Sequence, residues 1–284
     1  MANSQRNSIK IQIAKKNNLN SSIIHLNSLK SVRIEILSEG TKKRLSWASG
    51  FLIEKNKKIF LVTNWHVVSG RNFETNKILH FSGAFPGFLN LFYTGTKEKK
   101  IIKVKNKEVP LYKMKNKKEM TEISLWLEHP TMGSKIDVIA LDITHHLYKG
   151  IEYETYRINK EHKNELMVMD DVFIIGFPLI SSTTPNEYPV YKGATVASEP
   201  NKFDKLPIFY VDGKTKEGMS GSPVVRKQGF DANFEKRGLV INRGRTDLIG
   251  IYSGRERQSK DENEAELGIV WRINECLIPI LKIE

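Results

Sequence analysis

Residues 218–223 in the C-terminal half read Gly-Met-Ser-Gly-Ser-Pro and lead directly into Val224 and Val225. Glycine and proline this close together predict a sharp turn, and the two valines predict that the turn feeds a buried strand. Glycine at 218 lets the backbone approach a ligand closely and adopt dihedral angles that side chains disfavour. A serine hydroxyl beside outward-pointing backbone N–H groups is what a nucleophile with an oxyanion hole requires. The alternative interpretation of these six residues is an ordinary surface turn.

A base and a carboxylate that would complete such a site lie earlier in the chain. His66 lies in Thr-Asn-Trp-His-Val-Val at 63–68, after the apolar run 59–62, and Asp137 precedes the apolar run 138–141. With Ser220, these residues supply a general base, a group that orients it and a nucleophile. The six other histidines have no comparable context and no metal-binding spacing. They are His25, His80, His129, His145, His146 and His162.

Asp142 is the alternative carboxylate. Asp137 and Asp142 are separated by an odd number of residues, so on one strand their side chains point to opposite faces. The apolar run that follows Asp137 favours Asp137.

The chain resembles the trypsin-like serine peptidases of the chymotrypsin fold, and it is nearer the bacterial HtrA-type and trypsin-2 sequences than the digestive enzymes. The order of His66, Asp137 and Ser220 is the order found in that family. Four other segments match it in sequence order: Ser-Gly-Phe-Leu-Ile at 49–53, Ile-Gly-Phe-Pro at 175–178, Gly-Ile-Tyr-Ser-Gly at 250–254 and Gly-Ile-Val-Trp at 268–271.

The resemblance implies an all-β protein with two six-stranded antiparallel β-barrels and a short C-terminal helix, which Pro279 would limit. We expect an N-terminal extension (1–30), a first barrel with His66 and Asp137 (31–143), a connection (144–170) and a second barrel with Ser220 (171–284). Alternating or apolar segments predict the strands. They are 31–37, 45–53, 59–63, 123–130, 172–175, 191–198, 208–211, 222–225, 247–252 and 268–273.

The same resemblance assigns roles within the site. His66 takes the proton of Ser220, which attacks a peptide carbonyl and forms an acyl-enzyme, and the N–H groups of Gly218 and Ser220 form the oxyanion hole. Ser222 competes with Ser220 as the nucleophile, but relatives usually carry glycine there, and we expect it to narrow the primed side. Where digestive members have an aspartate that pairs with a new N-terminus, this chain has Met219, so activation through that ion pair is not expected.

For the specificity pocket, the family places the residue six positions before the nucleophile at the floor, which is Lys214 here. Tyr252, Ser253 and Gly254 are expected to line the pocket, with Arg255 directly after them. A cation there would repel lysine and arginine and favour an acidic side chain before the cut. In the alternative, Lys214 points to solvent and Tyr252 and Ser253 shape a pocket for a small apolar group.

Composition limits the other classes of function. Hydrophobic residues make up 39% of the chain, no apolar run approaches the length of a membrane span, and the polar N-terminus lacks the apolar core of a signal peptide. A single cysteine, Cys276, excludes an internal disulfide framework and is expected to be a packed thiol. We therefore expect a soluble, cytoplasmic protein, bacterial by its resemblance, with no membrane partner, cofactor or metal.

The net charge of +13 is compatible with nucleic-acid binding. Lysine is abundant along the whole chain, however, and densest at 97–118, and no nucleic-acid-binding module is visible, so a nucleic-acid partner is not favoured.

The sequence predicts an intracellular serine endopeptidase that acts on a protein or peptide substrate. The alternative is a catalytically silent trypsin-like fold that serves as a binding module. We expect control by loops, a regulatory partner or the N-terminal extension, and no appended PDZ domain, since the chain ends at Glu284.

Overall fold

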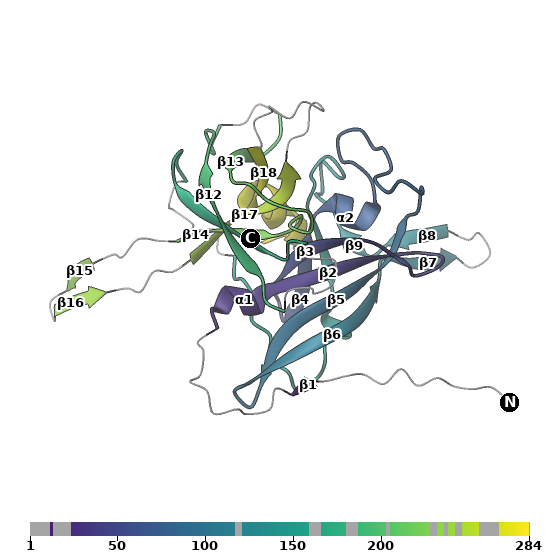
Figure 1. Cartoon of the computed structure of the whole chain (residues 1–284), viewed down its shortest axis with the longest axis horizontal. Coiled ribbons are helices and arrows are strands. Elements are labelled where there is room, and N and C mark those ends of the chain that lie inside the picture. Colours follow the sequence, from purple (N-terminus) through teal and green to yellow (C-terminus); the bar gives the residue numbers. More distant parts are fainter. Residues whose placement is uncertain are drawn as a thin grey trace.

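A computed structural model describes residues 12–13, 24–116, 121–158, 166–179, 187–202, 205–227, 232–235, 238–241, 246–255 and 267–283. Two antiparallel β-units lie side by side (Figure 1). The first is an eight-stranded sheet in the order β1-β6-β5-β2-β3-β4-β10-β9, and the second is a closed barrel in the order β11-β12-β13-β18-β17-β14.

The strands of the first sheet run from the N-terminal region to the residues just after Asp137. They are β1 (Gln12–Ile13), β2 (Ser31–Ser38), β3 (Arg44–Lys55), β4 (Lys58–Thr63), β5 (Pro86–Lys97), β6 (Lys100–Pro110), β9 (Trp126–Leu127) and β10 (Ile139–Asp142). Strand β2 pairs with β3 on one side and β5 on the other, and its apolar residues Val32, Ile34 and Ile36 are buried in the core. The alternating pattern at 31–37 is therefore the inner face of a central strand.

The second unit closes into a barrel, as the resemblance implied. Its strands are β11 (Asp171–Gly176), β12 (Val190–Val196), β13 (Ile208–Asp212), β14 (Pro223–Lys227), β17 (Thr246–Arg255) and β18 (Leu267–Arg272). Small hydrophobic residues such as Val172, Ile174 and Val224 fill its interior.

The predicted all-β class is confirmed, with one structural difference from two equal six-stranded barrels. The first unit contains eight strands, because β1 pairs with the edge strand β6 and the short β9 pairs with β10. Edge strands accept such additions because their backbone N–H and C=O groups are otherwise unpaired.

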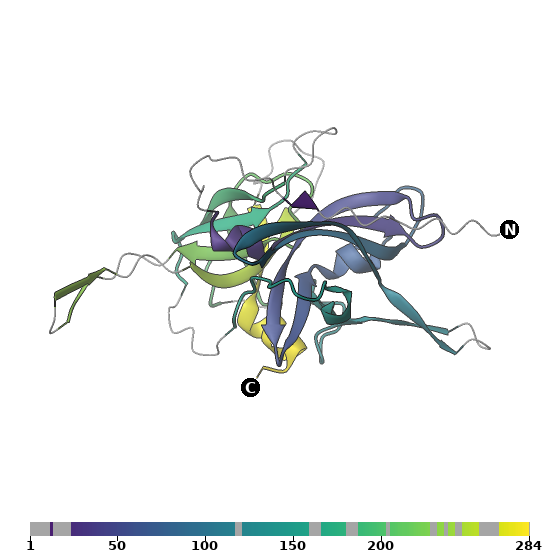
Figure 2. The same cartoon turned by 90° about the horizontal axis from the view of Figure 1, so that it is seen from below.

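Two hairpins project from the body in both views (Figures 1 and 2): β7 (Tyr112–Asn116) with β8 (Thr121–Ser124), and β15 (Ala232–Glu235) with β16 (Gly238–Ile241). The helical segments are short: α1 (Leu26–Lys30), α2 (Trp65–Ser69), a 3₁₀ turn (Thr144–His146), a π turn (Ile273–Leu277) and α3 (Ile278–Leu281). In α3, Pro279 lies in the first turn, where its missing N–H costs little. No helix in the described ranges is long and apolar enough to cross a membrane.

One hydrophobic cluster joins the two units. Phe51 and Val138 from the first sheet pack in the same cluster as Ile251 and Trp271 from the barrel and Leu277 from the C-terminal turn. Burial of this shared apolar surface fixes the two units against each other. Residues of both units line one cleft, and this packing fixes the relative position of its two sides.

Candidate active site

His66 is presented by the short helix that follows strand β4. Asn64 caps α2, and its side-chain amide donates to the backbone oxygen of Asp137 at 2.7 Å. Gly70 ends the helix with a left-handed φ of 68° and donates its N–H to the oxygen of His66. His66 is thus fixed at both ends of one helical turn, and 20% of its side chain is exposed.

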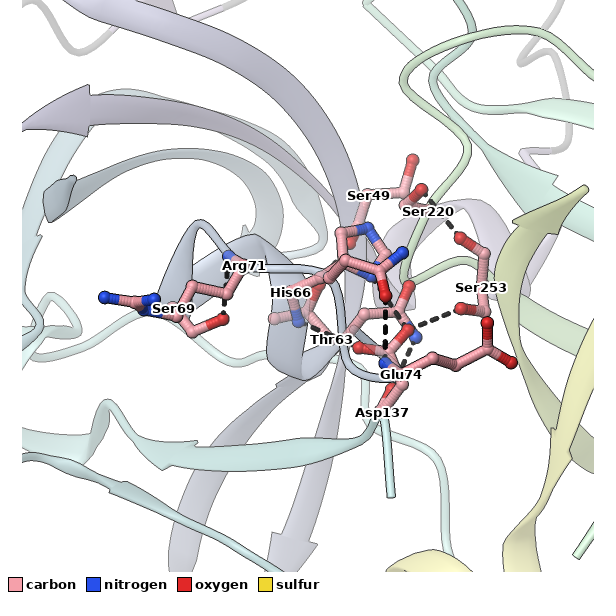
Figure 3. Close-up of polar contacts among 11 residues, drawn as sticks. Ser49, Thr63, His66, Ser69, Arg71, Glu74, Asp137, Ser220 and Ser253 are labelled. Atoms are coloured by element: carbon pink, nitrogen blue, oxygen red, sulfur yellow. Dashed lines mark hydrogen bonds and ion pairs between the residues drawn. The ribbon is translucent and has the colours of Figure 1, made fainter. Parts of the chain in front are cut away.

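The carboxylate of Asp137 is completely buried and is surrounded by donors (Figure 3). The backbone N–H of His66 donates to Oδ1 at 2.8 Å, and His66 Nδ1 lies 2.8 Å from Oδ2. The Ser253 hydroxyl donates to Oδ2 as well. A buried carboxylate is tolerated when its oxygens are hydrogen-bonded in this way.

Asp142, the alternative carboxylate, lies away from His66 at the end of β10. It accepts hydrogen bonds from the Thr144 hydroxyl at 2.6 Å and the Thr144 N–H at 3.0 Å, and Lys58 Nζ lies 3.0 Å from its Oδ2. Burial alone would raise the pKa of Asp142, but these hydrogen bonds and the lysine charge lower it overall. Asp137 lies two residues before β10 and Asp142 ends that strand, so the two side chains are not on opposite faces of one strand, and of the two it is Asp137 that contacts His66.

Ser220 lies on the glycine turn between β13 and β14. Its hydroxyl donates to the backbone oxygen of Ser253 at 2.9 Å, and its own backbone oxygen accepts from Ser49 N–H at 2.8 Å. Within the described ranges, no hydrogen bond joins the Ser220 hydroxyl to the His66 ring. Figure 3 shows Ser253 reaching both Ser220 and Asp137.

The glycines on either side of Ser220 are required by the backbone. Gly218 has a φ of 91°, and a Cβ there would lie 2.5 Å from the oxygen of Phe177. Gly221 has a φ of 83°, and a Cβ there would lie 2.1 Å from the oxygen of Ser49. Any side chain at either position would combine an unfavourable φ with a collision against backbone.

Two cavity-lining residues of this turn, Gly218 and Ser220, have backbone N–H groups that are candidate oxyanion donors. Among the described residues, the N–H groups of Gly218 and Ser220 have no hydrogen-bond acceptor. The turn is fixed by Ser49, whose hydroxyl donates to the oxygen of Gly218 at 2.7 Å and accepts from Phe177 N–H at 2.9 Å. Unused donors on a rigid turn beside a hydroxyl are suited to stabilising a developing oxyanion.

A cavity of about 570 Å³ lies over these groups and is open to His66, Gly218 and Ser220. It contains a donor pair, a hydroxyl and an imidazole backed by a buried carboxylate, so it can hold a carbonyl for attack. In the part of the chain that the structure describes, no cluster of histidine, cysteine and carboxylate side chains could hold a metal ion.

Comparison with known proteins identifies the family. The sequence profile described as a trypsin-like peptidase domain matches residues 48–230. The chain belongs to the trypsin-like peptidase domain family. The matched range contains His66, Asp137 and Ser220.

Solved structures similar to this trypsin-like peptidase domain include the Rv3671c protease in its inactive form, with 14% identity and a TM-score of 0.43, covering 90% of this chain and 89% of that one. An inactive serine-to-alanine mutant of Rv3671c from M. tuberculosis H37Rv gives 14% identity and a TM-score of 0.44, with coverage of 97% and 98%. Deg5 gives 14% identity and a TM-score of 0.44, with coverage of 87% and 85%. No curated protein matches the sequence.

In this trypsin-like peptidase domain, Lys214 does not form the floor of the cavity, and the expectation for that residue is corrected. Its side chain is exposed and the neighbouring Thr215 lines the cavity in its place, with its hydroxyl 2.5 Å from the Tyr252 hydroxyl. Arg255 also lines the cavity and donates to the oxygen of Thr215 at 2.7 Å. In place of Lys214, which the turn before Ser220 directs outward, the cations that line the cavity are Lys216 and Arg255.

Of the expected lining residues, Tyr252 and Gly254 contribute to the cavity, whereas Ser253 is buried beneath it and contacts Asp137. Ser222 is also completely buried, and its Oγ packs against Gly176. Ser222 therefore does not narrow the primed side of the cleft.

The sequence did not reveal the roles of three residues that organise the site, one of which, Ser253, was expected to line the specificity pocket. They are Ser49, which fixes the oxyanion turn, Asn64, which ties the helix of His66 to Asp137, and Ser253, which contacts both Asp137 and Ser220. All three lie in segments that resemble the family, which was the available signal. Cys276 is buried, and burial raises the pKa of its thiol, as expected of a packed cysteine.

Proposed function

We propose that this trypsin-like peptidase domain is an intracellular, cytoplasmic serine endopeptidase that uses His66, Asp137 and Ser220 as its catalytic triad. The observation that carries the proposal is the pairing of His66 Nδ1 with a buried Asp137 in a cleft that also exposes Ser220, on a turn with two unused N–H donors. The substrate is a protein or a peptide.

In the proposed mechanism, Asp137 holds the proton on His66 Nδ1, which leaves Nε2 as the base. The Ser220 hydroxyl leaves the Ser253 oxygen and turns toward Nε2, which breaks one hydrogen bond. His66 takes the proton while Ser220 Oγ attacks the peptide carbonyl. The oxygen of the tetrahedral intermediate lies against the N–H groups of Gly218 and Ser220.

Collapse of the intermediate breaks the C–N bond, and His66 returns the proton to the departing amine. The acyl group remains on Ser220 as an ester. A water molecule then gives its proton to His66 and attacks the ester carbonyl, which releases the acid and restores the serine.

Control by an ion pair with a new N-terminus is not part of the proposal, because Met219 occupies the position concerned and is packed in the barrel core, 2% exposed. We propose that a regulatory partner or the loops around the cleft control the activity instead.

The test is covalent labelling by a fluorophosphonate, which reacts with an activated serine. The wild-type protein should be labelled, and peptide mapping should place the label on Ser220. Ser220→Ala should lose labelling and peptide hydrolysis together. Ser222→Ala is the matched control, because Ser222 lies in the same turn but is buried away from the cleft.

Two results would contradict the proposal. Equal hydrolysis by the wild-type protein and Ser220→Ala would exclude Ser220 as the nucleophile. A folded wild-type protein that neither reacts with the probe nor cleaves any peptide would favour the alternative function, a silent fold that binds a partner.

A further inference from the structure

The cavity over Ser220 has two sides that differ in chemistry and in origin. Residues of the second barrel, among them Thr215, Lys216, Glu217 and Arg255, make one side polar and charged. The other side is contributed by the first sheet and the loop that follows His66. We call six of its apolar members the apolar wall: Leu45, Trp47, Leu79, Phe81, Ala84 and Pro86.

The apolar wall contains side chains that are unusually exposed for their type. Phe81 is 96% exposed and Leu79 is 53% exposed, and both border the cavity. Single exposed apolar residues are common, but a contiguous group along a cleft is typical of a surface that binds apolar groups.

The loop that carries Leu79 and Phe81 is held in place by its own hydrogen bonds. Leu79 N–H donates to the backbone oxygen of Gly70, the residue directly after the helix of His66, at 2.8 Å. Gly83 N–H donates to the backbone oxygen of His80 at 2.9 Å. His80 Nδ1 also lies 2.7 Å from the Ser82 hydroxyl. At the far end of the loop, Pro86 begins strand β5. The backbone of this loop is therefore held by hydrogen bonds without a substrate, which lowers the entropic cost of ordering it on binding.

The chemistry of peptide cleavage fixes which part of a substrate meets this wall. The departing amine receives its proton from His66, so the chain that follows the cut leaves on the side of His66. The loop bearing Leu79 and Phe81 begins directly after α2, the helix that contains His66. Trp47 lies on strand β3 of the first sheet.

We infer that the apolar wall selects a large apolar residue, such as leucine or phenylalanine, at the first position after the cut. This inference rests on the proposed serine peptidase function and assigns a specificity that the catalytic groups do not determine. The part of the substrate that binds the apolar wall is the segment after the cut, which leaves with the amine. The wall lines the same cavity as Ser220 and His66.

Partitioning of the acyl-enzyme between water and added amines tests the inference. A peptide ester acylates Ser220, and leucinamide, phenylalaninamide, serinamide or aspartamide is added as the acceptor. Mass spectrometry then gives the ratio of aminolysis to hydrolysis. This ratio is determined after the acyl-enzyme has formed. All four amides meet the same acyl group, so the substrate residues before the cut do not affect the comparison among them.

With the wild-type protein, leucinamide and phenylalaninamide should each exceed serinamide and aspartamide by roughly tenfold or more, the discrimination usual for an apolar subsite. Leu79→Ser and Phe81→Ser should each reduce that preference severalfold. Phe85→Ser is the matched control, because Phe85 lies in the same loop and is 36% exposed but does not line the cavity. It should keep the wild-type preference.

Equal use of all four amides by an acyl-enzyme that does form would overturn this inference and leave the proposed function intact. An equal loss of preference in Phe85→Ser and Leu79→Ser would also overturn it, because the effect would then come from the loop as a whole. If no acyl-enzyme forms with any ester, the proposed function and this inference both fail.

Discussion

Ser253 donates a hydrogen bond from its Oγ to Oδ2 of Asp137, the same carboxylate oxygen that faces His66 Nδ1. Its backbone oxygen accepts the hydroxyl of Ser220 at 2.9 Å. One residue therefore contacts both the carboxylate and the proposed nucleophile, and it comes from strand β17 of the second barrel, whereas Asp137 belongs to the first unit.

Ser253→Ala should slow the reaction of Ser220 with a fluorophosphonate by about tenfold to a hundredfold, because a hydrogen bond to a buried carboxylate is removed. In peptide hydrolysis, the loss of rate should appear in kcat rather than in KM, since the Ser253 hydroxyl faces Asp137 and not the cavity. A stopped time course of labelling measures the rate. Labelling at the wild-type rate by a folded variant would show that Asp137 is oriented without Ser253.

Asp142→Asn should lower stability at neutral pH by an amount that disappears in acid. Despite the opposing effect of burial, hydrogen bonds from Thr144 and the charge of Lys58 hold the pKa of Asp142 below its ordinary value in the folded state. A carboxyl with a lowered folded pKa stabilises the protein above its unfolded pKa, and this stabilisation is lost as the pH falls through the folded pKa. We expect a decrease in Tm of about 2 °C at pH 7 for this partly exposed group. A Tm difference that persists below pH 3 would contradict this explanation.

Cleavage after lysine or arginine should be disfavoured, because Arg255 and Lys216 both line the barrel side of the cavity. An acidic residue before the cut should be accepted best, and Arg255→Ala should weaken that preference. A positional-scanning peptide library compares the variants. Strong preference of the wild-type protein for a basic residue at this position would show that Arg255 does not face the substrate.

The parts of the site that were predictable depend on local sequence. His66 and Asp137 each adjoin an apolar run that must be a buried strand, and the glycines beside Ser220 are required by positive φ angles and close backbone contacts. Each of these signals lies within a few residues of the side chain concerned, so a single sequence reveals it.

The parts that were not predictable depend on how distant segments meet. Whether Lys214 or Arg255 faces the cavity depends on the path of the turn between β13 and Ser220, and no residue pattern specifies that path. The contact of Ser253 with Asp137 joins residues 116 positions apart. The eight strands of the first sheet likewise result from pairings at its edges, which leave no periodic signal in β1 or β9.

The division of the site between the two units has a consequence for synthesis of the protein. The imidazole and the carboxylate are translated first, and the hydroxyl and the oxyanion donors belong to the last quarter of the chain. A nascent chain that has reached residue 200 lacks Ser220 and the N–H groups of Gly218 and Ser220, so under the proposed mechanism it has no peptidase activity. Under the proposed mechanism, activity also requires that the second barrel pack against the first sheet, so the appearance of peptide hydrolysis after synthesis would report when that packing is complete.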